Sequence, residues 1–323
     1  MQRERLCRII FTTIIYVMKN YYLLFLSVVL FFIGASQLHA DDKALVVYLN
    51  DGTRVQYLLS DVDSVMFEKY RPEPTYHNGF EYVDLNLSVK WATCNVGAAE
   101  PQQAGYYIAW ADTIGYTDYR IDEKQFSMNN YVYSKGTDRS LSKYCNLPAY
   151  GYVVNEETGE KFVDDLVTLL PEDDAALRYM GEGWSTPTRS QMIELKNNCY
   201  WQWTDDYKGT GIPGYIVFKV KDEQDKQLFS FRGQPKATYD IDDVHIFLPM
   251  AGYRRGAGGS DTSNFNAAGV WSLGTSGNYW TADIDKGTPS NANMLNLKTN
   301  NITVNATGGD RCYGRCIRAV YSE

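Results

Sequence analysis

The sequence predicts an α+β fold in which a few helices are segregated from many short strands. Two helix signatures follow one another in the middle of the chain, over residues 171–181 and 188–199. Short runs rich in β-branched and aromatic residues come before and after them, separated by turn-forming segments. This order, strands, then helices, then many strands, is typical of α+β proteins.

Both helices carry start or stop signals. In the first, Pro171 stands at the first turn, acidic residues follow it, and Gly181 marks the exit. In the second, Thr188 and Gln191 have capping-box spacing, so that the threonine hydroxyl covers an amide while the glutamine reaches back. Residues at helical spacing predict one buried face on this second helix: Met192, Leu195 and Cys199.

The strands expected after the helices are six apolar-rich runs. They are GYIVFKV (214–220), QLFSFR (227–232), VHIFLPM (244–250), NYWTAD (278–283), ANMLNLK (292–298) and NITVN (301–305). A glycine-rich loop, GAGGSDTSNF (256–265), interrupts the series.

The first 40 residues predict an export signal. Lys19 precedes an apolar run over 21–32, and small residues lead to a cleavage site after Ala40. The run is shorter than the about 20 residues of a membrane span. A signal that begins at Met18 is complete, so we expect translation to start there and the mature chain to be exported and soluble. The remainder is long enough for one large domain, or for a large and a small one.

Two units are expected after the signal. Residues 41–69 form a small β-hairpin unit, because KALVVYL and TRVQYLL flank the turn signal Asn50-Asp51-Gly52. Residues 70–76 contain two prolines and form a linker. Residues 77–323 form the main domain. The hairpin unit is too small to hold much core, so we expect it to pack on something or to act as a spacer.

Composition excludes one class of partner and leaves another question open. The net charge is −8 and no basic block follows residue 40, which argues against nucleic-acid binding. Aromatic residues make up 14% of the chain, with 26 tyrosines. Tyrosine suits half-buried strands, but it also suits ligand surfaces, since it joins apolar area to a polar edge.

An ordered set of motifs then resembles the Fibrobacter succinogenes major paralogous domain, which secreted proteins of Bacteroidetes-type bacteria carry. The motifs are EYVDLNLSVKWATCNVGA (81–98), GYYIAWADT (105–113), GWSTPTRSQMIEL (183–195), NNCYWQWT (197–204), IFLPMAGYR (246–254), GNYWTA (277–282) and YGRCIRAV (313–320). The resemblance implies the formylglycine-generating-enzyme branch of the C-type-lectin-like fold, with two helices, a twisted antiparallel sheet and long loops. The hairpin unit resembles a short module that precedes surface domains in the same bacteria.

The tail RCYGRCIR (311–318) raises the question whether Cys312 and Cys316 are a redox pair, metal ligands or structural anchors. Formylglycine-generating enzymes hold copper(I) with a cysteine pair upstream of a terminal segment whose own cysteine is structural. The resemblance places YGRC (313–316) at that terminal segment, and no cysteine occurs between residues 200 and 311. We therefore expect Cys316 to be structural and the catalytic pair to be missing.

Export favours disulfide bonds among the five cysteines after residue 40. If one extended strand carries Cys312 and Cys316, they lie too far apart to bond to each other. We favour a bond from Cys316 to Cys94 or Cys199, and one cysteine of the five must stay unpaired within the chain. The disulfide candidates are Cys94, Cys145, Cys199, Cys312 and Cys316.

Other catalytic and metal motifs are missing from the mature sequence. Its histidines, His77 and His245, are isolated and are not expected to bind metal. Calcium-dependent sugar binding stays open, although the sequence stretches typical of sugar-binding C-type lectins do not occur. Adjacent carboxylate pairs, at 164–165, 173–174, 205–206 and 242–243, are interpreted as solvent-exposed. We expect no cofactor and no metal.

A ligand surface is possible among aromatic residues and one arginine, although the same residues could form core packing. The candidates are Trp201, Trp203, Tyr253, Arg254 and Trp280. The resulting hypothesis is an exported, surface-associated, non-catalytic binding module for glycans or a surface protein. The alternatives are a copper cysteine oxidase with relocated residues and a structural or adhesive surface subunit.

Overall fold

The computed structural model describes residues 27–28, 43–66, 73–116, 126–256 and 269–322. The chain forms two compact units, Met1–Tyr70 and Arg71–Glu323. The division falls at the start of the interval 70–76 that the sequence predicts as a linker. The predicted signal segment lies outside the described residues, except for Ser27 and Val28.

The first unit is a small antiparallel sheet with the strand order β1-β2-β3. Its strands are β1 (Ser27–Val28), β2 (Ala44–Tyr48) and β3 (Arg54–Leu58). The predicted hairpin turn is present: the Thr53 amide donates to Asp51 Oδ1 at 2.8 Å, and Gly52 adopts a φ of 85°. The short apolar run that follows, DSVMFE (63–68), is a candidate for a further strand, but its described residues, 63–66, form none. Tyr57 and Leu58 stay about half exposed, at 52% and 49%, so the described strands of this unit bury little apolar surface.

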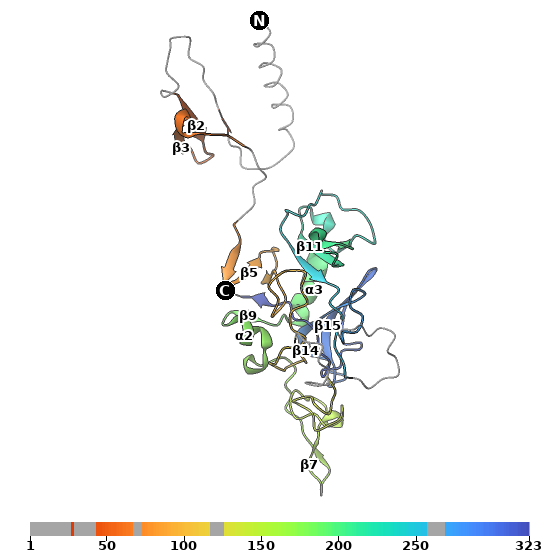
Figure 1. Ribbon diagram of the computed structural model, residues 1–323. Coiled ribbons are helices and arrows are strands. Elements are labelled where there is room, and N and C mark those ends of the chain that lie inside the picture. The colour runs from red at the N-terminus through yellow and green to blue at the C-terminus, as the bar shows by residue number, and fades with distance from the viewer. Residues whose placement is uncertain (1–26, 29–42, 67–72, 117–125, 257–268, 323) are drawn as a thin grey trace, which may run out of the picture. The chain divides into compact units, whose positions relative to one another are not determined.

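The described residues of the second unit form four sheets (Figure 1). One contains β4 (Thr75–His77), β5 (Phe80–Val83), β6 (Lys90–Ala92), β17 (Val320–Tyr321) and β9 (Trp184–Ser185), in this order. The next contains β12 (Leu228–Phe229), β10 (Cys199–Thr204), β11 (Gly214–Lys219) and β13 (His245–Pro249). The third contains β14 (Gly277–Ile284), β15 (Ala292–Lys298) and β16 (Asn301–Asn305), and the last contains β7 (Val153–Asn155) and β8 (Glu160–Lys161).

The described chain is therefore a mixed α+β protein, mostly of strands, with curled antiparallel sheets and two α-helices. All strand pairs are antiparallel except β10 with β12. The six predicted strands after the helices are all present. The run QLFSFR keeps only the two residues of β12, because the Arg232 amide turns back to the Phe229 carbonyl at 2.7 Å.

The first helix begins later than predicted. Residues Pro171–Asp173 form a short 3-10 turn, and the α-helix α2 spans Ala175–Met180. The cause is Asp174, whose side chain accepts from the Ala176 amide at 2.9 Å and so caps the helix. Gly181 closes the helix with a φ of 87°, as predicted.

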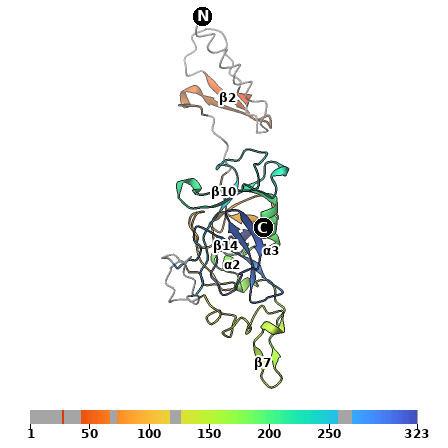
Figure 2. The same cartoon turned by 90° about the vertical axis from the view of Figure 1, so that its right-hand side faces the viewer.

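The second helix, α3 (Arg189–Asn198), confirms the capping box at Thr188 and Gln191. Met192 and Leu195 are fully buried on the expected face, whereas Cys199 follows the helix and begins β10. Figures 1 and 2 both place α3 beside the sheet of β14, β15 and β16. The helix thereby covers the largest apolar cluster of the domain.

The C-terminal tail differs from the single extended strand that the sequence predicted. Cys312 lies in a turn, in which the Tyr313 amide donates to the Asp310 carbonyl at 3.0 Å. Extended pairing resumes at Gly314 and ends in β17, which lies between β6 and β9. The premise that Cys312 and Cys316 share one strand is therefore wrong, because the turn separates them.

Candidate functional site

Three arginines of the tail enter the interior of the domain: Arg311, Arg315 and Arg318 are each at most 2% exposed. Arg311 is held by four hydrogen bonds, from Nε to the Tyr131 hydroxyl and from its terminal nitrogens to the carbonyls of Lys143, Tyr144 and Pro289, all at 3.0–3.2 Å. Because a buried guanidinium needs many acceptors, this arrangement ties the tail to the segment before the helices.

Arg318 is equally well satisfied. Its Nε donates to Asn95 Oδ1 at 2.9 Å, and its terminal nitrogens donate to the carbonyls of Ala92, Thr93 and Phe247 at 2.6–3.2 Å. These acceptors come from the neighbourhood of β6 and from β13. One side chain therefore joins two sheets through neutral carbonyl groups.

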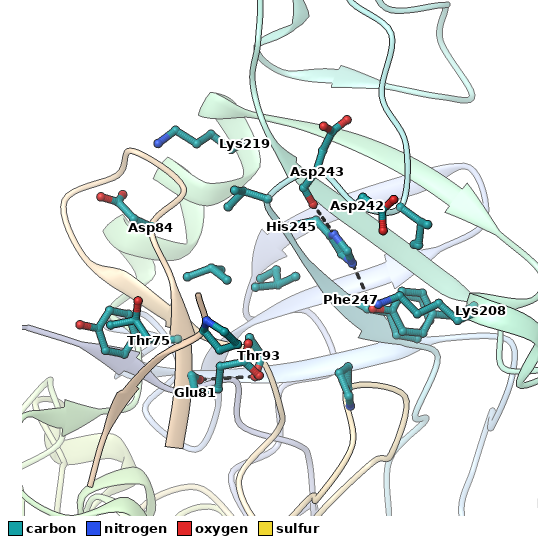
Figure 3. Close-up of a pocket in the computed structure, with 18 of the residues that line it drawn as sticks. Thr75, Glu81, Asp84, Thr93, Lys208, Lys219, Asp242, Asp243, His245 and Phe247 are labelled. Atoms are coloured by element: carbon teal, nitrogen blue, oxygen red, sulfur yellow. Dashed lines mark hydrogen bonds between the residues drawn. The ribbon is translucent and has the colours of Figure 1, made fainter. Parts of the chain in front are cut away.

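Thr93 and Phe247 also line a pocket of this domain, which has a volume of about 660 Å³ (Figure 3). We call it the acidic pocket, because five carboxylates and two lysines line it: Glu73, Glu81, Asp84, Asp242, Asp243, Lys208 and Lys219. Figure 3 shows Thr75 and Asp84 on one side of the pocket, with Asp242 and Asp243 on the other.

The polar groups of the acidic pocket largely satisfy one another or neighbouring residues. Asp84 pairs with Lys90 at 2.7 Å, and this hydrogen bond lowers the pKa of the carboxyl. Asp243 forms an ion pair with Lys221. Glu81 accepts from the Thr93 hydroxyl at 3.2 Å. The acidic lining is therefore largely committed to the protein's own donors.

His245, the first residue of β13, lines this pocket on the same side as Asp242 and Asp243 (Figure 3). Its Nε2 lies 3.0 Å from the Tyr207 hydroxyl, and its Nδ1 lies 2.7 Å from the Asp243 carbonyl oxygen. Burial lowers the pKa of the imidazole, while the hydrogen bond to Asp243 opposes this effect. Both ring nitrogens are in use, so His245 is a packed residue and not a free base.

A smaller pocket has a volume of about 360 Å³ and the opposite charge. We call it the basic pocket: Arg255, Lys298 and Arg315 line it, against the single carboxylate Asp310. Its residues come from four places, namely the segment after β13, strands β14 and β15, and the tail. Long-range packing brings them together.

Two tyrosine rings, those of Tyr253 and Tyr313, form part of the wall. Tyr253 and Tyr313 stack with their centroids 6.0 Å apart and a 23° angle between the planes. The guanidinium of Arg255 lies 3.7 Å from the centre of the Trp271 ring, which fixes the cation by a cation–π contact. The pocket thus presents tyrosine rings beside a positioned positive charge.

Arg315 lies at the base of this pocket and differs from the other two tail arginines. It lies 4.3 Å from the centre of the Trp280 ring. Its terminal nitrogens donate to the carbonyls of Asp310, at 3.3 Å, and Gly308. Among the described residues its Nε has no hydrogen-bond partner. Burial lowers the pKa of this guanidinium to about 10, so it remains charged at neutral pH.

Amide and hydroxyl groups complete the lining. Asn278 is buried and donates to Ser276 Oγ at 2.9 Å, whereas Asn296 and Ser272 are partly exposed. Such groups can donate and accept hydrogen bonds to a hydroxylated ligand. Aromatic faces, amides and cations in one hollow suit binding rather than acid–base catalysis.

The structure brings one of the five predicted ligand residues, Tyr253, to the basic pocket. Trp201 and Trp280 are core residues at 0% and 1% exposure, and Arg254 is buried at 3%. Trp203 is partly buried. Its indole packs edge-on against the Tyr215 ring, as that of Trp201 also does, so the two indoles lie on the same face of β10.

The sequence reading missed Arg255, Lys298 and Tyr313. One signal could have found Arg255: in an extended segment, residues 253 and 255 lie on one face and residue 254 on the other. Arg254 indeed points into the interior, where its guanidinium lies 5.8 Å from the centre of the Tyr107 ring. Lys298 and Tyr313 come from distant parts of the chain, and no local pattern marks them.

The acidic pair Asp173-Asp174 corrects another expectation, because both residues are buried. Asp173 accepts from the hydroxyls of Tyr133 and Tyr144 and pairs with Lys143 at 2.5 Å. Asp174 accepts from the amide and hydroxyl of Thr186, at 2.8 and 2.6 Å, besides capping α2. These two carboxylates are structural.

No disulfide bond joins the five cysteines within the described residues. Burial raises the pKa of Cys199 and of Cys316 to about 12, and it also raises the pKa of Cys94 and Cys145. Disulfide formation after export stays a prediction. Within the described part of the chain, no cluster of three His, Cys, Asp or Glu residues could hold a metal ion.

Comparison of the chain with protein-family models, with characterised proteins and with solved structures finds no match. Among the helices that the structure describes, none combines the length and apolar character needed to cross a bilayer.

Proposed function

We propose that the chain is an exported, surface-associated, non-catalytic binding module whose ligand is a glycan or a surface protein. The basic pocket is the observation that carries this proposal. It combines the stacked rings of Tyr253 and Tyr313 with the cation of Arg255 and the amide of Asn296 in one hollow of about 360 Å³. Sugar and protein ligands are both recognised by such mixtures of apolar face and hydrogen-bonding edge.

The proposed fold family is the C-type-lectin-like fold, in the branch that includes the Fibrobacter succinogenes major paralogous domain. The two α-helices α2 and α3, the curled antiparallel sheets and the long connections between them support this assignment. The pairing of β17 with β6 and β9 adds support, because it brings together three of the resembling motifs, 81–98, 183–195 and 313–320. We propose export on the basis of the predicted leader.

The buried thiols support a non-catalytic role over the copper-oxidase alternative. A cysteine that binds copper or attacks a substrate does so as a thiolate. Cys316 is fully buried and its pKa is raised to about 12, so the thiolate is disfavoured at neutral pH. Copper content after reconstitution with copper(I) tests this directly. Stoichiometric copper that disappears in Cys316→Ser would support the oxidase instead.

A structural or adhesive role is the second candidate, and one observation favours it. The hairpin unit exposes several large apolar side chains, including Tyr57, Leu58 and Met66. Exposed apolar groups of this kind mark surfaces that bind partners. Deleting residues 41–70 and measuring surface assembly tests this role; unchanged assembly would count against it.

Glycan-array and cell-surface binding of residues 41–323 tests the binding function. We expect Tyr253→Ala and Tyr313→Ala to reduce binding at least tenfold, or by about 1.4 kcal/mol, since each removes one aromatic ring from the pocket lining. Tyr76→Ala is the matched control, because Tyr76 is 59% exposed and lines neither pocket. Binding that survives both pocket variants, or no binding to any glycan or surface protein, would contradict the proposal.

A further inference from the structure

The basic pocket carries a charge opposite to that of the chain. Its lining has three cations, Arg255, Lys298 and Arg315, against one carboxylate, Asp310. The whole chain has a net charge of −8. A local positive site in an acidic protein attracts anions to that site and leaves the remaining surface repulsive to them.

The buried charge of Arg315 is incompletely compensated. Among the described residues its hydrogen-bond acceptors are two backbone carbonyls, those of Gly308 and Asp310, and no carboxylate. Arg311 and Arg318, by comparison, each make four hydrogen bonds. The Nε of Arg315 has no partner in the described part of the chain. A buried cation with few acceptors raises the positive potential of the pocket above it.

Two cations are accessible to a ligand at the rim. Lys298 is exposed at the end of β15, and Arg255 is partly exposed. The Trp271 ring holds the Arg255 guanidinium in place, with 3.7 Å between the two. An arginine fixed in this way loses little conformational entropy when it binds an anion, and its planar fork matches carboxylate and sulfate oxygens.

We propose that the basic pocket binds an acidic glycan, in which a sugar ring lies against Tyr253 and Tyr313 while its anionic group meets Arg255 and Lys298. This inference rests on the proposed binding function and specifies its ligand class. The amide of Asn296 and the hydroxyl of Ser272 are placed in the lining for the sugar hydroxyls. The anionic group is a carboxylate or a sulfate, since both present oxygens to the same fork.

The aromatic walls favour a sugar over an acidic peptide. A peptide carboxylate needs cations alone, whereas the apolar face of a sugar ring gains from a tyrosine ring. The acidic pocket is unsuited to the same ligand, because five carboxylates line it. The charge of the lining, and not the volume of the pocket, therefore decides which of the two pockets suits an acidic sugar.

Calorimetric titration of residues 41–323 with oligosaccharides of equal length tests the proposal. The probes are tetragalacturonate, its fully methyl-esterified form, a sulfated galactose tetramer and, as the peptide source of carboxylates, tetraglutamate. The methyl ester keeps the sugar and removes the charge. The variants are Arg255→Gln and Lys298→Gln, each of which keeps a polar side chain of similar length. Lys286→Gln is the control, because Lys286 is exposed and lines neither pocket.

We expect tetragalacturonate or the sulfated tetramer to bind at least tenfold more tightly than the methyl ester. Either probe supports the proposal, and the tighter one identifies the anionic group. Each pocket variant should lose roughly three- to tenfold in affinity for the acidic probe, the control should lose nothing, and salt should weaken binding because exposed charges are screened beyond about 10 Å at 0.1 M.

Three outcomes would overturn the proposal. Equal affinity for the acidic and the neutral tetramer would overturn the charge requirement, yet it would leave the proposed binding function standing if Tyr253→Ala still weakened both. Tetraglutamate binding as tight as that of the sugars would overturn the glycan assignment. Unchanged affinity in both Arg255→Gln and Lys298→Gln, with their thermal unfolding unaltered, would place the ligand elsewhere. Failure of every glycan and surface protein to bind would instead remove the proposed function itself.

Discussion

The acidic pocket and the basic pocket each have a tail arginine next to them, but the two arginines are bound differently. Arg318 lies behind the acidic pocket and makes four hydrogen bonds, three of them to the backbone carbonyls of Ala92, Thr93 and Phe247. Arg315 lies at the basic pocket and makes two, to carbonyl oxygens. Both side chains are almost fully buried, so burial alone does not separate them.

This difference indicates that the volume of a pocket in this domain does not predict whether the pocket suits a ligand. The acidic pocket is larger, at about 660 Å³ against 360 Å³. Yet Asp84, Asp243 and His245 already have partners in the protein. The smaller pocket keeps positive charge in excess. Groups left incompletely satisfied, in a cavity, are the better indicator of a site that takes a ligand.

The largest effect is expected at Arg318. Arg318→Met keeps the approximate volume but leaves the carbonyls of Ala92, Thr93 and Phe247 without their donor. We expect a loss of about 3–5 kcal/mol in the free energy of unfolding, because each buried orphaned acceptor costs about 1–3 kcal/mol and some will recover water. Urea denaturation measures it. A loss below about 1 kcal/mol would mean that Arg318 is no more important for stability than Arg315.

Arg315→Met should cost less, about 1–2 kcal/mol, because only the carbonyls of Gly308 and Asp310 lose a donor. The same variant should also weaken acidic-sugar binding, since it removes a buried positive charge at the pocket, while the salt dependence that comes from the accessible cations Arg255 and Lys298 should remain. Parallel urea curves for Arg315→Met and Arg318→Met give the comparison. Equal destabilisation by the two substitutions would show that both arginines are equally structural.

His245, which lines the acidic pocket, makes the free energy of unfolding depend on pH. Burial lowers the pKa of the folded imidazole below its unfolded value of about 6.5. The unfolded chain therefore binds the proton more readily, and stability rises with pH. The stability contribution of neutral His245 is fully present above about pH 6.5 and is lost as the pH falls through the folded pKa.

His245→Asn should flatten this part of the profile, because asparagine does not titrate. The measurement is the free energy of unfolding of both proteins between pH 7.5 and pH 5. A wild-type slope as flat as that of the variant would mean that His245 is not desolvated enough to matter.

The smallest effect on stability is expected at the rim. Lys298→Gln should change the free energy of unfolding by less than about 0.5 kcal/mol, because Lys298 is exposed and surface substitutions rarely matter more. Thermal unfolding by calorimetry checks it. A larger loss would make Lys298 part of the folded framework and weaken its assignment to the ligand site.

Local patterns predicted most elements of the fold. The turn at Asp51-Gly52, the capping box of Thr188 and Gln191, and the six strands after the helices were all readable, because each depends on a few neighbouring residues. The start of α2 was wrong by four residues, since Asp174 competes with Pro171 for the position of the cap. Thr186 donates two further hydrogen bonds to Asp174, which hold its side chain in the capping position.

The candidate site was far less predictable. The tail drew attention to its two cysteines, whereas its arginines make most of the polar contacts that hold it. Nothing local shows that Arg311 will meet Tyr131, or that Arg315 will lie under Tyr253. Alternation along an extended segment could have preferred Arg255 to Arg254, but it could not have supplied Lys298.

Local sequence accounts for the helices, strands and turns and for their order, because helix caps, turn residues and strand propensity act over a few positions. The acidic net charge follows from composition alone. Tertiary structure decided which charges are neutralised. Most of the hydrogen bonds that hold Arg311 and Arg318 join residues more than 150 positions apart. Packing leaves Arg315 with two acceptors beside a cavity. The number of hydrogen-bond acceptors is important because these side chains are buried, and a polar group without a partner is most unfavourable in free energy where water cannot reach it.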